Sequence, residues 1–84
     1  MEIIVEIPEY TGEGLRSEWE YGFEIETKIN NGEFLISANK AGLISLAKQL
    51  LTLAQDSVPS NYHLHFDEYN SLEEGSVELI IQKV

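Results

Sequence analysis

Two histidines and an aspartate alternate along one short segment, at His63, His65 and Asp67. Alternate residues of a strand point to one face, about 7 Å apart. These side chains could therefore share a metal ion, with Glu78 from a neighbouring strand. Imidazole and carboxylate suit zinc or iron. Any strand with one solvated face gives the same spacing, so we favour a polar outer face, with no metal and no cofactor.

The same histidines could act as acids or bases, because imidazole titrates near neutral pH. The rest of the sequence offers no motif that would complete a catalytic site. It has no cysteine, no G-x-S-x-G nucleophile turn and no glycine-rich phosphate loop. We therefore predict that the protein is not an enzyme and has no catalytic residues.

Acidic residues dominate the surface chemistry. Fifteen Asp and Glu against five Lys and Arg give 84 residues a formal charge of −10, yet 43% of the residues are hydrophobic. The apolar content excludes a disordered acidic tail. The charge disfavours nucleic acid as a partner and favours a cationic one. Nine acids lie in residues 1–33 and five in 67–84, whereas residues 34–66 hold only Asp56.

The length suits one domain over residues 1–84. Because cysteine is absent, packing alone must stabilise the fold, which favours the cytoplasm. The first residues lack the basic and apolar regions of a signal peptide. No apolar stretch approaches the roughly 20 residues of a membrane span. We expect a cytoplasmic protein without a membrane anchor.

Several segments alternate apolar and polar residues with the period of a strand. The most specific signal is Asn31-Gly32, which is typical of a two-residue hairpin turn. It predicts a register that pairs Asn30 with Glu33 and continues to Ile25 opposite Ala38. The five predicted strands are residues 1–7, 19–30, 33–38, 62–66 and 77–82.

One helix is predicted from Lys40 to about Gln55, with Asn39 as its N-cap. Its apolar residues recur at helical spacing and should face the core. Leu72 should anchor the loop between the last two strands. The expected apolar face consists of Leu43, Leu46, Ala47, Leu50, Leu51 and Ala54.

These elements predict an α+β fold with a four- to five-stranded, mainly antiparallel sheet in the order β-β-β-α-β-β. The single amphipathic helix should pack on one face of that sheet. The other face should stay open, acidic and dotted with aliphatic side chains, as partner interfaces often are.

The open face and its adjoining loops are the predicted partner-binding surface. Trp19 and Tyr69 are candidate aromatic anchors, as is Tyr10, whereas parity places Tyr21 and Tyr62 in the core. The predicted binding residues are Trp19, Glu20, Glu24, Glu26, His63, His65, Asp67, Glu68, Tyr69, Glu73, Glu74 and Glu78.

The helix and the two last strands carry a family resemblance, at residues 39–51 (NKAGLISLAKQLL), 62–68 (YHLHFDE) and 72–81 (LEEGSVELII). This part of the chain resembles immunity protein 32, a small family of bacterial polymorphic toxin systems. The resemblance implies a cytoplasmic protein that binds and neutralises a cognate toxin domain. With the acidic surface, it favours stoichiometric occlusion of a basic toxin.

Two other classes of function stay open. A metal- or small-molecule-binding module would use His63, His65 and Asp67. A self-associating structural domain would form a homodimer through the open sheet face.

Overall fold

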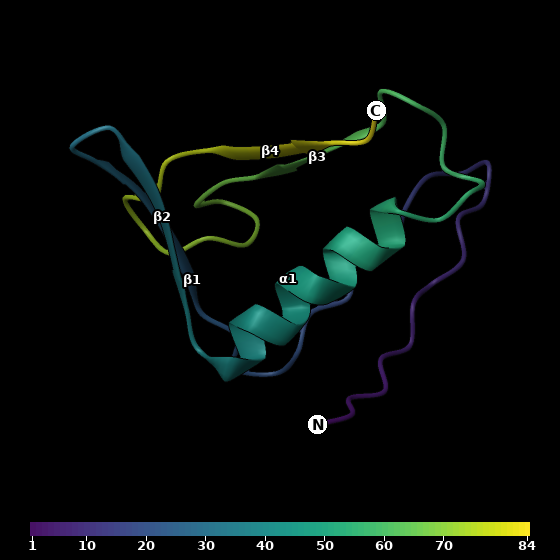
Figure 1. The fold of residues 1–84 in the computed structure, drawn as a ribbon, viewed down its shortest axis with the longest axis horizontal. Coiled ribbons are helices and arrows are strands. Elements are labelled where there is room, and N and C mark those ends of the chain that lie inside the picture. The colour runs from purple at the N-terminus through teal and green to yellow at the C-terminus, as the bar shows by residue number, and fades with distance from the viewer.

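The computed structural model describes all residues from 1 to 84 (Figure 1). It contains one helix and two separate two-stranded antiparallel sheets. The α+β class and the single helix are therefore confirmed, whereas the single sheet of four to five strands is wrong. The elements are β1 (Ile25–Asn30), β2 (Glu33–Ala38), α1 (Lys40–Leu53), β3 (His63–Phe66) and β4 (Leu79–Gln82).

The predicted first strand, residues 1–7, does not form, and the strand predicted from Trp19 begins only at Ile25. Residues 1–24 hold a single isolated bridge, between Thr11 and Gly14. Alternation alone does not make a strand, because each strand also needs a ladder partner for its backbone groups. The N-terminal residues instead run beside α1, on the side away from β3 and β4 (Figure 1).

The predicted hairpin is confirmed, including every pair of its register from Ile25–Ala38 to Asn30–Glu33. Asn31 and Gly32 have φ values of 53° and 80°, as a type I′ turn requires at both central positions. Strands β3 and β4 also pair as neighbours, with Phe66 opposite Leu79.

The free edge of β1 is covered by the segment that leads into β4. The Glu73 amide donates to the Ile25 carbonyl (2.8 Å), and the Val77 amide donates to the Thr27 carbonyl (3.2 Å). The Thr27 amide donates to Ser76 Oγ (3.2 Å), and its hydroxyl donates to the Val77 carbonyl. These bonds join the two sheets, and Ile25 and Thr27 are fully buried there.

The core centres on Ile25, Phe66 and Leu72, so the predicted anchoring role of Leu72 is confirmed. Trp19 belongs to this core: its ring stacks on Phe23 at 4.8 Å and meets Phe66 edge-on at 5.8 Å. Other partly buried hydrophobic residues pack around the cluster, namely Ala38, Leu46, Leu64, Leu79 and Ile81.

The two tyrosines that parity placed in the core differ in the structure. Tyr62 is half-buried: its hydroxyl accepts a bond from the Leu15 amide (3.3 Å), and its ring meets Tyr10 edge-on. Tyr21 is fully exposed, so its predicted burial is wrong. The reason is that residue 21 lies in a turn ahead of β1, where strand parity does not apply.

Helix α1 starts as predicted, because Asn39 Oδ1 accepts a bond from the Gly42 amide at 2.8 Å. The helix ends at Leu53, two residues earlier than expected. Beyond that end, Lys83 Nζ donates to the carbonyls of Gln55 (2.6 Å) and Val58 (2.8 Å). No helix is long and apolar enough to cross a membrane.

The prediction that the leucine-rich face of α1 forms the core is wrong for most of that face, although Leu46 does pack against the core cluster. Leu43, Leu50 and Leu51 are 57%, 50% and 48% exposed. The opposite face is buried instead, and most of it is small or polar. The buried helix residues are Gly42, Ser45, Gln49, Thr52 and Leu53.

Hydrogen bonding explains this orientation. Residues 8–20 form no ladder, so their backbone groups need other partners. The buried face of α1 and the residue beyond its C-cap supply them. Ser45 Oγ accepts from the Glu20 amide (2.8 Å), Gln49 Nε2 donates to the Glu18 carbonyl (2.7 Å), and Gln55 Nε2 donates to the Pro8 carbonyl (3.0 Å).

Gly42 allows the first turn of α1 to lie directly against β1. A Cβ at this position would collide with the Glu24 carbonyl oxygen and crowd Ile25. The close approach brings the start of the helix, the end of β2 and the start of β1 to one place, where the acidic cleft described below opens.

Candidate partner-binding site

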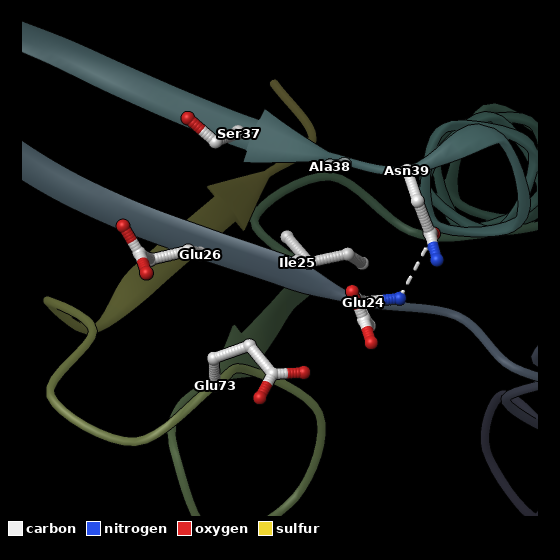
Figure 2. A pocket seen from close by; sticks show the side chains of 7 residues that line it. All are labelled: Glu24, Ile25, Glu26, Ser37, Ala38, Asn39 and Glu73. Atoms are coloured by element: carbon white, nitrogen blue, oxygen red, sulfur yellow. Dashed lines mark hydrogen bonds between the residues drawn. The ribbon is translucent and has the colours of Figure 1, made fainter.

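A shallow cleft of about 300 Å³ opens where β1, the end of β2 and the loop between β3 and β4 meet (Figure 2). Three carboxylates line it: Glu24 immediately before β1, Glu26 in β1, and Glu73 in the loop between β3 and β4. The remaining lining residues are Ile25, Ser37, Ala38 and Asn39. The predicted residues Glu24, Glu26 and Glu73 are thus brought together by the fold.

Asn39 holds one wall of the cleft in place. Its Oδ1 accepts from the Glu24 amide (3.0 Å) as well as from the Gly42 amide, and its Nδ2 donates to the Gly22 carbonyl (3.0 Å). The sequence identified Asn39 only as a helix cap. Its second role could not be predicted, because it depends on residues 22–24 lying against the start of α1.

The cleft carries uncompensated negative charge. Glu26 pairs with Lys28 (3.0 Å), but both side chains are substantially exposed, and such pairs contribute little. The carboxylates of Glu24 and Glu73 make no hydrogen bond or ion pair. A cationic side chain that enters the cleft would therefore meet acceptors that no other protein group occupies.

The same loop lines a second acidic hollow, formed by Glu68, Tyr69 and Glu74. Tyr69 is 90% exposed. Glu68 Oε2 accepts from the Gly75 amide at 2.8 Å, which closes the loop on itself. Hydrogen bonding to Glu68 raises the pKa of Tyr69 above that of an ordinary tyrosine, and the negative charges of Glu68 and Asp67 add to the effect.

Asp67 organises this loop and does not join the histidines. Its Oδ1 accepts from the amides of Tyr69 (2.9 Å) and Asn70 (3.1 Å), an arrangement that turns the chain after β3. Asn70 Nδ2 then donates to the His65 carbonyl (3.0 Å). Asp67 thus sets the position of Glu68 and Tyr69 relative to the sheet.

His63 and His65 share the exposed face of β3, with ring centroids 4.8 Å apart. As expected, Glu78 reaches this face from the neighbouring strand segment and lies beside His65, with its Oε1 3.1 Å from His65 Nδ1. No three His, Asp or Glu side chains are grouped as ligands of a metal ion. The three-ligand cluster of His63, His65 and Asp67 is therefore not assembled, because Asp67 is used in the turn.

Trp19 and Glu20 line neither acidic hollow. Trp19 packs in the core, and Glu20 forms an ion pair with Lys48 of α1 at 3.5 Å. The predicted binding residues therefore do not form one surface. Some line the cleft, others lie in the adjoining loop or on the exposed face of β3, Trp19 packs in the core, and Glu20 lies against α1.

Comparison with known proteins supports one family. The family model for immunity protein 32 matches residues 33–84, from the start of β2 to the last residue. No curated protein and no solved structure matches the chain. The matched region includes α1, β3, β4 and the acidic loop. It covers more than half of the chain and confirms the resemblance found in the sequence, so the protein belongs to the immunity protein 32 family.

Proposed function

We propose that this protein neutralises a cognate, basic toxin domain in the cytoplasm by binding it stoichiometrically through the acidic cleft and the loop of residues 67–76. Family membership supplies the functional class. The observation that supports the binding face is the convergence of Glu24, Glu26 and Glu73 on one cleft, with Lys28 the one cation paired there.

The mechanism needs no catalysis by this chain. A net charge of −10 attracts a basic toxin over long range and raises the rate of encounter. In the complex, the cleft carboxylates pair with cationic side chains at the toxin's active site and cover it. Tyr69, which is almost fully exposed beside the cleft loop, supplies an aromatic contact that toxin binding would bury.

Rigid backbone contacts favour this face. The Glu73 amide is bonded to β1, and Asn39 fixes the backbone at Glu24, so two of the carboxylates project from backbone that is already held in place. Less conformational entropy is then lost when the toxin binds.

The test is charge reversal in the cleft. The double variant Glu24→Lys, Glu26→Lys should bind an inactivated cognate toxin roughly 10- to 100-fold more weakly, mainly through slower association. Its affinity should also depend less steeply on salt. Surface plasmon resonance at several salt concentrations measures both.

The matched control is Glu6→Lys, Glu9→Lys, which changes the net charge equally at exposed positions of the N-terminal segment. Equal losses in both variants would show a general charge effect and no specific cleft. Unchanged affinity and salt dependence in the cleft variant would contradict the proposed binding face.

A further inference from the structure

An apolar surface on α1 has no role in the proposed toxin interface. Leu43, Leu50 and Leu51 are each about half exposed. A groove of about 580 Å³ runs between the helix and the N-terminal segment, and all but one of its lining residues are hydrophobic. We call this surface the apolar helix face; it comprises Met1, Ile3, Val5, Leu43, Ile44, Ala47, Leu50 and Leu51.

The helix side of this face offers a basic toxin no carboxylate to pair with. Helix α1 contains no Asp or Glu, and its charged residues are Lys40 and Lys48. Lys48 is paired with Glu20, whereas Lys40 lines the groove and makes no ion pair. A basic partner would meet three carboxylates in the acidic cleft, whereas the groove itself is lined by hydrophobic side chains and Lys40, with the exposed Glu2 and Glu6 of the N-terminal segment beside it.

The ends of the helix point to a complementary partner. Lys40 lies in the first turn, where a positive charge opposes the helix dipole, and no acidic residue offsets it there. At the other end, Lys83 already donates to the carbonyls of Gln55 and Val58, and the exposed Asp56 makes no ion pair. An antiparallel second copy would bring its Asp56 to Lys40 and its Lys40 to Asp56, so that each of these unpaired charges would gain a partner of opposite sign.

We propose that the protein forms a two-fold homodimer in which α1 packs antiparallel against α1 of a second copy through the apolar helix face. A two-fold axis at Ala47 places Leu43 opposite Leu51 of the second copy, and Lys40 opposite the end of its helix near Asp56. Each contact then occurs twice. The side chain at the crossing point is small, and Met1, Ile3 and Val5 of the N-terminal segment border the contact.

This dimer should respond to salt with the opposite sign to toxin binding. Each copy carries −10, so the two copies repel at long range, and added salt screens that repulsion. The contact itself is mainly apolar and loses little on screening. Self-association should therefore strengthen with salt, whereas association with a basic toxin should weaken.

Sedimentation velocity on the free protein tests the proposal, from about 1 µM to about 500 µM and at low and high salt. The wild type should shift from monomer to dimer with concentration, at lower concentrations in high salt. Ala47→Glu should weaken the dimer by roughly 10- to 100-fold, because two carboxylates would face each other at the axis. Residue 47 is exposed in the monomer, so circular dichroism should show an intact helix.

The matched control is Ile80→Glu, which adds the same charge at an exposed apolar position of β4 and should leave the dimer intact. Lys40→Glu and Asp56→Lys should each weaken it by about two- to fivefold, and the combined variant should recover. A wild type that stays monomeric at every concentration overturns the proposal. A dimer that survives Ala47→Glu also overturns it. If the wild type is monomeric and Ala47→Glu loses affinity for toxin, the apolar helix face belongs to the toxin interface and the dimer proposal is overturned.

Discussion

At the scale of single residues, short polar side chains decide much of the local structure. Asn39 caps α1 and also holds the backbone at Glu24, and Asp67 turns the chain so that Glu68 and Tyr69 project beside the sheet. Both side chains act on the backbone. The backbone positions of Glu24 and Glu68 are therefore fixed by these two side chains, and the carboxylate of Glu24 stays free to bind a partner.

Tyr69 gives a prediction at this scale. Glu68 favours the neutral phenol of Tyr69 and so raises the pKa of Tyr69. This side chain therefore stays protonated to higher pH than an ordinary tyrosine. In Glu68→Gln the pKa of Tyr69 should fall toward its usual value, since the negative charge is removed. NMR titration of ring-labelled tyrosine measures it, and an unchanged pKa in the variant would place the cause elsewhere.

At the scale of elements, α1 is the main departure from expectation. Its pattern is amphipathic, but the polar side is buried, because Ser45 and Gln49 bond the backbone of a segment that has no sheet partner. The apolar side is left at the surface, where we propose that a second copy covers it.

Gln49 tests this orientation. The side chain is 2% exposed, and its amide donates to the Glu18 carbonyl. Gln49→Leu should lower the free energy of unfolding by about 1–3 kcal/mol, because that carbonyl loses its partner. Urea denaturation measures the change. Gln82→Leu, on the exposed side of β4, should stay within about 0.5 kcal/mol of wild type. If the two variants were equally stable, Gln49 would not hold residues 8–20 against the helix.

At the scale of the whole molecule, the two proposed interfaces occupy different surfaces. The acidic cleft lies between the hairpin and the 67–76 loop, whereas the apolar helix face lies between α1 and the N-terminal segment. The lining residues of the two hollows do not overlap. Their linings also differ in chemistry, since three carboxylates line the cleft, whereas all but one of the residues that line the groove are hydrophobic.

Because the two interfaces are separate, one molecule of this protein should bind the toxin and a second copy of itself at the same time. Light scattering coupled to size-exclusion chromatography should detect a complex with two copies of each protein, and Ala47→Glu should reduce it to one of each without changing toxin affinity. Dissociation of the dimer on adding toxin would show that the two surfaces overlap or are coupled.

The sequence alone was sufficient for features that local chemistry controls. Asn31-Gly32 specified the hairpin and its register, Asn39 specified the start of α1, and alternation around Phe66 and Leu79 indicated the last two strands. It also determined the acidity and the family. Each depends on residues close together in the chain or on composition.

Only the tertiary structure decided how the chain divides into sheets and which side of α1 is buried. Residues 1–7 alternate like a strand but find no ladder partner, and residues 73–77 cover the edge of β1. Periodicity divides a helix into two faces without saying which one lies inside. The polar face of α1 is buried because its side chains bond the backbone of residues 8–20. A buried amide or carbonyl without a partner costs more free energy than an exposed leucine.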